Sequence, residues 1–392
     1  MKKFKLSLLT RILIALVCGI LLGGVLPQGV VRVFVTFNSL FGNFLSFSIP
    51  LIILGLVTPA IGNLGKGAGR LLLITTLIAY GSTLFSGFFT YFSCAAIFPD
   101  MLQSGVLLDA LSKPESSALK PFFTVEMPPL MGVMTALLLS FLIGMGLSSI
   151  NGTALRDGFR DFGEIVKKLI EHLLVPLLPF YIFGVFLSMS VHSQMESFLG
   201  VFMQVIIVIF ALHVLLLFIQ FGITGAICRK NPLRMLWNML PAYATALGTQ
   251  SSAATIPVTM KQAVKNGVDE DVATFTVPLC ATIHLAGSTM KIVACSMAIM
   301  VMTDMPIPFS LFAGFIVMLG ITMVAAPGVP GGAIMAALGV LHTMLGFTDA
   351  HQSMMIVLYI VMDSFGTACN VTGDGAIAML VHQIKLWGVR RV

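Results

Sequence analysis

The sequence predicts an all-α integral membrane protein with eight transmembrane helices and two re-entrant hairpins. The 392 residues are 57% hydrophobic and only 10% charged, whereas soluble domains carry roughly 25% charged residues. The apolar runs are long and unbroken, with a mean hydropathy of +1.01. This favours spanning helices of about 20 residues over the alternating strands of a β-barrel. In the C-terminal half, proline, glycine and hydroxyl residues interrupt two apolar segments, and no lipid-facing helix tolerates this.

The N-terminal half contains six expected spanning helices. The first covers about residues 8–26 and resembles a signal peptide. We expect it to be retained, because Arg11 interrupts its apolar run and no convincing small-residue cleavage site follows. The other five are expected at about residues 30–62, 71–97, 129–150, 169–190 and 197–227.

Basic residues predict how these helices are oriented. Loops rich in Lys and Arg, at residues 66–70, 156–168 and 229–234, alternate with loops that are poor in both. By the positive-inside rule, the basic loops and both termini face the cytoplasm of an inner-membrane protein. The polar, slightly acidic stretch 99–127 then lies outside. The net charge of +6 follows from this topology and does not indicate nucleic-acid binding.

Two interrupted segments predict the re-entrant hairpins. In residues 235–264, prolines and a glycine surround a Thr/Gln/Ser-rich centre, and basic residues flank both ends, so this hairpin enters from the cytoplasm. In residues 308–347, two apolar arms surround Ala-Ala-Pro-Gly-Val-Pro-Gly-Gly, and the flanks hold Asp but no Lys or Arg, so this hairpin enters from outside. Each is followed by a spanning helix, at 271–303 and 352–381. Two such units of opposite orientation form an inverted repeat, which points to a transporter binding site.

The last expected helix carries a polar stripe. Asp363, Thr367, Asn370 and Asp374 follow one another at spacings of four, three and four residues, which places them on one helical face. An acid near the bilayer centre costs about 2.5–3.5 kcal/mol, so this face meets protein, water, an ion or a substrate. Asp363 and Asp374 lie roughly 16 Å apart along the helix and cannot share a proton as an aspartyl protease pair would. We therefore expect neither an enzyme nor a covalent cofactor.

Other polar residues extend the candidate site. The tip of the first hairpin, residues 248–255, offers hydroxyls and half-helix N–H groups that favour a carboxylate, although helix capping inside the bundle is the alternative. His284 is compatible with proton transfer or with hydrogen bonding in the core. Lys291 lies too deep in its apolar run to reach the interface easily. We expect it to pair with a carboxylate of the substrate, of Asp363 or of Asp374, either for function or for structure alone.

The tip of the second hairpin, residues 327–332, supplies bare backbone. Its carbonyls suit Na⁺ and its glycines allow a flap to hinge, with helix packing as the alternative. A channel or a non-transporting receptor is the other class of function. The second inverted hairpin favours alternating access instead.

Four ordered motifs resemble one known family. The chain contains, in this order, TALGTQSSAATIPVTM, TIHLAGS, APGVPGG and DSFGTACNVTGD. They are similar to the first hairpin, seventh helix, second hairpin and eighth helix of the dicarboxylate/amino acid:cation symporters, the glutamate-transporter-like family. In motif character the chain is closest to the serine/threonine, neutral amino acid branch.

The resemblance covers essentially the whole chain and implies the elevator fold of this family. It also implies Na⁺-coupled symport of an amino acid across the lipid bilayer, and a homotrimer. A scaffold that forms the trimer is expected from residues 1–70 and 99–195. The transport domain is expected from residues 71–98 and 196–392.

The resemblance also assigns roles to residues of this chain. It implies that Asp363 binds the substrate's α-amino group and that Asn370 and Ser252 hold its α-carboxylate. The expected substrate pocket consists of Ser251, Ser252, Ser288, Lys291, Val329, Gly331, Asp363, Gly366, Thr367 and Asn370. The first sodium site is expected from the Asp374 side chain with backbone oxygens of Cys280, His284 and Asn370. The second is expected from backbone oxygens of Thr282, Met323, Val324 and Ala326.

One departure from the family pattern bears on coupling. Where members usually have Asn-Met-Asp-Gly-Thr, this chain has His-Leu-Ala-Gly-Ser. His284 and Ala286 thus replace two ligands of a third sodium site, and we expect fewer than three coupled Na⁺. Coupling to H⁺ through His284 stays open.

A second departure bears on the substrate. Gly366 stands where members that carry acidic substrates have an arginine that grips the side-chain carboxylate. Its absence favours a neutral, small or polar amino acid such as Ser, Thr or Ala. The alternative is an acidic amino acid or a dicarboxylate held by Lys291. Asp363 argues against an amine-free dicarboxylate, because its charge would then be unpaired.

Overall fold

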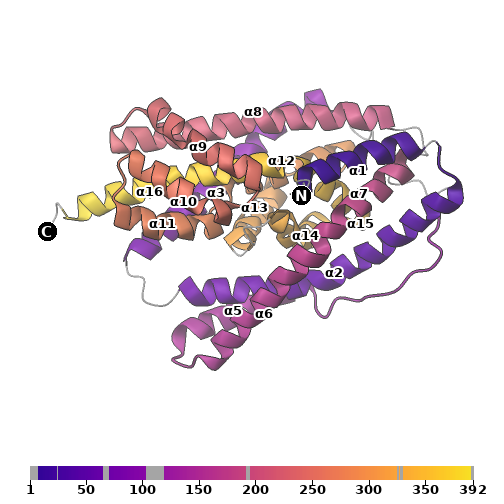
Figure 1. Ribbon diagram of the computed structural model, residues 1–392, viewed down its shortest axis with the longest axis horizontal. Coiled ribbons are helices and arrows are strands. Elements are labelled where there is room, and N and C mark those ends of the chain that lie inside the picture. Colours follow the sequence, from indigo (N-terminus) through magenta and orange to yellow (C-terminus); the bar gives the residue numbers. More distant parts are fainter. Residues whose placement is uncertain are drawn as a thin grey trace, which may run out of the picture.

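The structure is a computed structural model that describes residues 8–23, 25–64, 70–102, 119–190, 195–324, 326 and 330–389. All regular secondary structure in these ranges is helical, which confirms the all-α class. The longest axis of the molecule lies horizontally in Figure 1, where α8 (Met195–Cys228) borders one long side and helices of the C-terminal half fill the middle.

The N-terminal half folds into helices close to the expected positions. They are α1 (Leu8–Gly23), α2 (Gln28–Leu64), α3 (Arg70–Met101), α5 (Val133–Ser149), α6 (Ala154–Leu169), the π-helical turn η1 (Ile170–Leu174), α7 (Val175–Ser190) and α8. Each long apolar run forms a helix because backbone groups in lipid must find their partners within the segment.

The expectation of a basic loop at residues 156–168 is wrong. This segment is helix α6, and it continues through η1 into α7. Charged residues cover its outer face, whereas Gly163 and Val166 are buried against α2. The contact is close, since a Cβ at Gly55 would lie 2.7 Å from Val166 Cγ2. The segment therefore forms a helix because its apolar residues recur at helical spacing and pack on α2, although its charges also suit a loop.

The C-terminal half consists of four helix pairs. They are α9 (Pro232–Thr249) with α10 (Ser252–Lys265), α11 (Glu270–Ile283) with α12 (Ala286–Met302), α13 (Phe309–Val324) with α14 (Gly332–Leu345), and α15 (Asp349–Val361) with α16 (Asp363–Val389). The arms of the two expected hairpins are α9–α10 and α13–α14, and each pair packs arm against arm. Their re-entrant placement in a membrane stays a prediction.

Two segments expected as single helices are broken instead. Residues 271–303 divide at His284 and Leu285, whose backbone leaves the helical region. Residues 352–381 divide at Met362, where α15 and α16 meet at an angle of 62°. Neither break contains a proline, so the apolar pattern of the sequence predicted one continuous helix at each place.

The hairpin tips leave half-helix ends inside the molecule. Gln250 adopts a left-handed conformation (φ 54°) at the end of α9, and Ser251 then caps α10 by accepting a hydrogen bond from the Ala254 N–H at 3.3 Å. Gly331 precedes α14 with φ 73°, a conformation that glycine adopts without steric cost.

Five helical stretches in the described ranges are long and apolar enough to cross a membrane, or six when α15 and α16 count as one bent span. The eight expected spans are thus matched only in part. Helices α1, α5, α13 and α14 are shorter apolar helices. The stretch Glu270–Met302, which includes α12, is buried inside the protein over the whole of its apolar window.

The helices pack in two groups. Helix α2 packs on α5, α6 and α7, and α1 packs on α7. Helix α3 joins the C-terminal half instead, packing on α12 and α13, while α16 packs on α8, α9, α10, α11 and α12. The polar stripe of α16 therefore lies at the centre of the second group.

Candidate functional site

The polar stripe of α16 is buried as expected. Asp363, Thr367, Asn370 and Asp374 are 4%, 7%, 2% and 1% exposed. They face the break between α11 and α12 and the tip of the α13–α14 hairpin, to whose residues three of them bind. The stripe thus meets protein groups that are themselves polar.

Asp363 begins α16, directly after the break at Met362. Its Oδ2 accepts a hydrogen bond from the Gly331 N–H at 2.7 Å. Its Oδ1 lies 3.2 Å from Lys291 Nζ, with which it forms a buried ion pair. Both oxygens of this carboxylate therefore already have partners from other elements.

Lys291 is only 1% exposed and is fully engaged. Besides Asp363, its Nζ donates to the Met362 carbonyl at 3.2 Å and lies 3.7 Å from the centre of the Tyr359 ring. A buried ammonium needs such partners, since isolating it from water is costly. Of the carboxylates considered from the sequence, the structure thus pairs Lys291 with Asp363 and not with Asp374.

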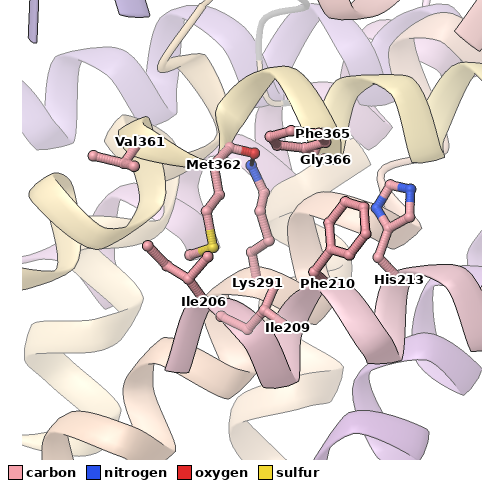
Figure 2. A pocket seen from close by; sticks show the side chains of 9 residues that line it. All are labelled: Ile206, Ile209, Phe210, His213, Lys291, Val361, Met362, Phe365 and Gly366. Carbon is pink, nitrogen blue, oxygen red and sulfur yellow. Dashed lines mark hydrogen bonds between the residues drawn. The ribbon is translucent and has the colours of Figure 1, made fainter. Parts of the chain in front are cut away.

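Lys291 also fills the space beside Gly366. A Cβ at Gly366 would lie 2.2 Å from Lys291 Cε and 2.4 Å from its Nζ. Figure 2 shows the lysine stem passing this glycine next to a cavity of about 90 Å³ between α8 and the α15–α16 break. The cavity is lined mainly by apolar groups, among them Ile206, Ile209 and Phe210. The place next to Gly366 is therefore occupied by a cation of the neighbouring helix.

Asn370 caps the first turn of α12. Its Oδ1 accepts from the backbone N–H groups of Gly287 at 2.8 Å and Ser288 at 3.3 Å, and its Nδ2 donates to Ser288 Oγ at 3.1 Å. The hydroxyl of Tyr359 donates to the same Oγ at 3.0 Å. The α12 N-terminus, a natural site for a carboxylate, is thus held by a neutral amide.

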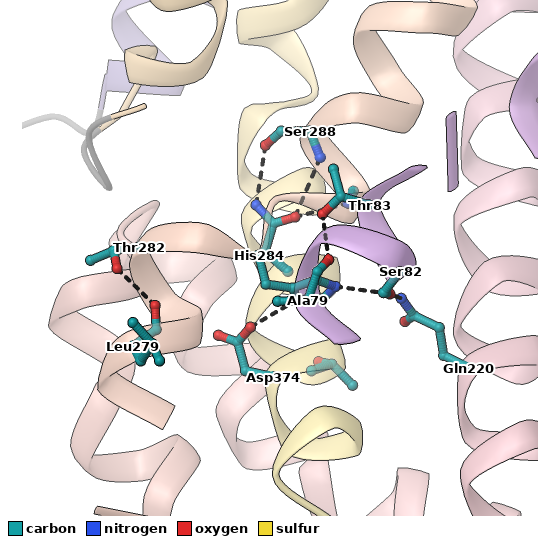
Figure 3. A network of polar contacts seen from close by, with 12 residues as sticks. Ala79, Ser82, Thr83, Gln220, Leu279, Thr282, His284, Ser288 and Asp374 are labelled. Carbon is teal, nitrogen blue, oxygen red and sulfur yellow. Dashed lines mark hydrogen bonds and ion pairs between the residues drawn. The ribbon is translucent and has the colours of Figure 1, made fainter. Parts of the chain in front are cut away.

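His284 and Asp374 form a second buried pair at the α11–α12 break. Nδ1 of His284 lies 2.9 Å from Asp374 Oδ1, and Nε2 lies 3.1 Å from Ser82 Oγ of α3. Ser82 in turn accepts from Gln220 Nε2 of α8 at 3.1 Å. Figure 3 shows this chain running from α16 through the histidine to α3 and α8. The imidazole therefore contacts the carboxylate expected to bind sodium.

Comparisons with known proteins identify the family. The family model for "Sodium:dicarboxylate symporter family" matches residues 8–384. The chain belongs to the sodium:dicarboxylate symporter family. It is therefore a multi-pass membrane protein of a family of cation-coupled secondary transporters, and not an enzyme.

Individual relatives agree with this assignment. The chain is 24% identical to a serine/threonine transporter SstT of Acinetobacter baylyi, over 97% of its own length and 98% of the relative's. It is 25% identical to the SstT of Streptococcus suis, over 84% and 93%. With excitatory amino acid transporter 1 of Rattus norvegicus it shares 30% identity over 60% of its own chain and 43% of the relative.

The remaining expected substrate residues lie at several places. Ser252 is buried in the first turn of α10, which packs on α16, and Thr367 donates to the Asp363 carbonyl at 3.0 Å. No hydrogen bond joins Ser252 to Asn370 among the residues with described positions. Val329 lies outside the described residues.

The first expected sodium site has a donor set that suits Na⁺. Asp374 Oδ2 has no hydrogen-bond donor among the described groups, so one carboxylate oxygen remains for a cation. The Cys280 carbonyl accepts a hydrogen bond from the His284 N–H at 2.8 Å, whereas the break after Ile283 leaves the carbonyls that follow Cys280 without a further turn of α11. Carboxylate and carbonyl oxygens are the ligands that hard cations prefer. The site is a proposal, and the histidine on Oδ1 is part of it.

The second expected sodium site would join two helix ends. Met323 and Val324 lie in the last turn of α13, and Ala326 follows it. Helix α11, which carries Thr282, contacts α13. The Thr282 hydroxyl donates to the Leu279 carbonyl at 2.7 Å. This site too stays a prediction.

Several residues that the structure brings to the site were not predicted from the sequence. Tyr359 contacts both Lys291 and Ser288, and Ser82 and Gln220 hold the far nitrogen of His284. The spacing of four residues between Tyr359 and Asp363 was a usable signal, since it continues the polar stripe toward the N-terminus. Ser82 and Gln220 gave no such signal, because Ser82 is one of many hydroxyl residues along α3 and Gln220 stands within the long apolar run of α8.

The premise of the expectation against an amine-free dicarboxylate is wrong. It assumed that the carboxylate would otherwise be unpaired. The structure supplies Lys291 and the Gly331 N–H instead. Asp363 is therefore neutralised by the protein itself.

Proposed function

We propose that this protein is a Na⁺-coupled symporter of a small neutral amino acid such as Ser, Thr or Ala. The observation that carries the proposal is the buried Lys291–Asp363 pair beside Gly366. Its two charges cancel, so the pocket offers one negative and one positive group of net charge zero. A zwitterion matches such a pocket without leaving a buried charge uncompensated, whereas an acidic amino acid adds one.

When the pair separates, Asp363 and Lys291 supply both contacts that an amino acid needs. An α-amino group fits Asp363, and an α-carboxylate fits the Lys291 ammonium or the hydroxyl and amide groups of Ser288, Asn370 and Ser252. Among the described residues, no arginine or free cation remains for a second carboxylate at the position of Gly366. The full-length similarity to two serine/threonine transporters supports this substrate class.

The second candidate is an acidic amino acid or a dicarboxylate bound by Lys291. One observation favours it: Asp363 already has a cation, so the substrate need not carry an amine. In this case the Lys291 ammonium leaves Asp363 and binds a carboxylate of the substrate. Coupling to H⁺ through His284, instead of coupling to Na⁺, is a further alternative, because the His284 ring contacts Asp374.

The transport cycle proposed here is an elevator movement within a homotrimer. Helices α3 and α8–α16 form the moving domain, and α1, α2, α5, α6 and α7 form the trimeric scaffold. Support comes from the packing, since each set contacts chiefly its own members. A bound Na⁺ supplies positive charge at Asp374, and the chain holds the substrate between the α9–α10 and α13–α14 tips. The placement in the inner membrane with cytoplasmic termini rests on the positive-inside rule.

Uptake into liposomes tests the proposal. The purified protein is reconstituted, and accumulation of labelled serine, threonine, alanine, aspartate and succinate is measured under a Na⁺ gradient, a pH gradient or neither. We expect saturable, Na⁺-driven accumulation of the neutral amino acids. Accumulation of only aspartate or succinate supports the second candidate, and accumulation driven by pH alone shows H⁺ coupling. Protein that accumulates nothing under any gradient is a channel or a receptor, which contradicts both.

A further inference from the structure

A basic cavity of about 340 Å³ lies away from the transport site, where α8 turns into α9 and α10 ends. Three cations line it, Lys230, Arg234 and Lys265, together with the amides of Asn231, Asn238 and Asn266. Its wall thus comes from the α8–α9 turn and from both arms of the first hairpin.

Hydrogen bonds hold the inner wall of this basic cavity in place. Lys230 Nζ donates to the Asn266 carbonyl at 2.7 Å. The Asn266 side chain accepts from Asn238 Nδ2 at 2.8 Å and donates to the Met235 carbonyl at 3.1 Å. Gly267 follows with φ 86°, and a Cβ there would lie 2.6 Å from Lys230 Nζ. The cavity is therefore built by a fixed network and does not depend on a ligand to form.

The charge of the basic cavity is not balanced by the protein. Of the residues that the structure describes, no Asp or Glu lines it. In the described part of the chain, the Arg234 guanidinium and the Lys265 ammonium have no ion-pair partner. The nearby Asp269 is engaged elsewhere, lying 3.6 Å from His382 and 4.0 Å from Lys385. Three cations that line one cavity favour an anion, and the planar fork of Arg234 suits a phosphate.

The surface next to the basic cavity identifies the kind of anion. Leu233, Trp237 and Leu240 are 62%, 72% and 40% exposed, and their spacing of four and three residues places them on one face of α9. A large exposed apolar stripe on a membrane protein contacts lipid, and exposed tryptophan is typical of the interface with water. A phosphate in the cavity and acyl chains on this stripe describe one phospholipid.

We propose that the basic cavity binds the phosphate headgroup of an anionic phospholipid, whose acyl chains lie along Leu233, Trp237 and Leu240. The occupant bridges α8 and the two arms of the first hairpin at the membrane surface. The basic cavity is a separate place from the transport site, since no cavity-lining residue belongs to that site.

Thermal unfolding of the detergent-purified protein tests the proposal. Phosphatidylglycerol, phosphatidylcholine and inorganic phosphate are added separately, and the affinity is obtained from the concentration dependence of Tm. We expect phosphatidylglycerol to raise Tm and the zwitterionic phosphatidylcholine to have little effect. Arg234→Gln with Lys265→Gln is expected to weaken phosphatidylglycerol binding roughly 20- to 30-fold, because each basic residue near a lipid surface contributes about fivefold.

Matched controls make the outcome decisive. Lys261→Gln removes an exposed cation of α10 outside the cavity and is expected to leave the affinity unchanged. Arg234 and Lys265 are exposed, so their double variant should unfold at the wild-type Tm without lipid. Equal stabilisation by phosphatidylglycerol and phosphatidylcholine overturns the proposal, and so does full binding by the double variant. Stabilisation by inorganic phosphate as strong as by phosphatidylglycerol assigns the cavity to free phosphate and overturns the lipid assignment.

Discussion

Buried charges dominate the site at the scale of single residues. Lys291 and Asp363 neutralise each other, and His284 contacts Asp374, all with exposures of 4% or less. A buried charge that loses its partner is far more costly than a pair that is removed together. Single and double substitutions should therefore differ sharply.

Lys291→Met is expected to lower the free energy of unfolding by about 3–5 kcal/mol, because it leaves Asp363 buried and unpaired. The double variant Lys291→Met with Asp363→Asn should recover most of this loss. Thermal unfolding in detergent measures both. A single variant as stable as the wild type would show that the pair does not form. In the uptake assay, the single variant should also lose serine transport.

Asp374→Asn tests the first sodium site. Removing the charge while keeping the shape should raise the Na⁺ concentration for half-maximal uptake about tenfold or more, since a charged contact contributes about 1.5–3 kcal/mol. Asp349→Asn, at an exposed carboxylate of α15, is the control and should leave the Na⁺ dependence unchanged. An unaltered Na⁺ dependence in Asp374→Asn would assign coupling to another group.

Helix breaks and close helix contacts matter at the scale of elements. The breaks at His284–Leu285 and Met362 place the start of α12 and the start of α16 side by side. There Asn370 accepts a hydrogen bond from the first turn of α12, and Asp363 accepts one from Lys291. Small residues allow this approach, as is common in membrane helix pairs. A Cβ at Gly287 would lie 2.5 Å from Cys369 Cβ and 2.6 Å from the Gly366 carbonyl.

Gly287→Ala should therefore destabilise the protein by about 1–3 kcal/mol, because the added methyl group meets backbone that cannot yield without separating α12 from α16. The measurement is the unfolding midpoint in detergent. Gly222→Ala is the matched control: it lies in helix α8, and a Cβ there meets nothing within 4 Å. Equal stability of the two variants would contradict the close contact.

At the scale of the whole molecule, the main feature is the contact surface between the two groups of helices. Helix α7 belongs to the group of α1 and α2, whereas α15 belongs to the group that carries the site. The hydroxyls of Tyr181 on α7 and Ser353 on α15 are in hydrogen-bond contact across this surface. An elevator movement must separate these two residues.

Cross-linking tests that movement. In a background whose six native cysteines are replaced, Tyr181→Cys with Ser353→Cys should be joined by a short thiol cross-linker, and uptake should then stop. Reductive cleavage of a disulfide-containing linker should restore it. Each single cysteine variant treated in the same way is the control and should keep its uptake. Full transport by the cross-linked protein would rule out relative movement of α7 and α15.

Much of this organisation was predictable from the sequence. Membrane helices are specified locally, because each apolar run must satisfy its own backbone groups in lipid. The proline, glycine and hydroxyl residues within two apolar segments, 235–264 and 308–347, therefore predicted that each segment forms a pair of helices. The helical period likewise placed Asp363 and Asp374 on one face. The four motifs identified the family that the family model confirms.

The tertiary structure decided what each buried polar group meets. Lys291 had three possible carboxylate partners, and 72 residues separate it from the one it binds. His284 and Asp374 are 90 residues apart. The α11–α12 break carries no proline, so helical periodicity could not reveal it. Partner choice depends on which distant segments approach within a few ångströms, and neither periodicity nor composition contains that information. The sequence by itself thus determined the helices, the polar stripe and the family, whereas only the packing of α12 against α16 determined that Lys291 occupies the place beside Gly366.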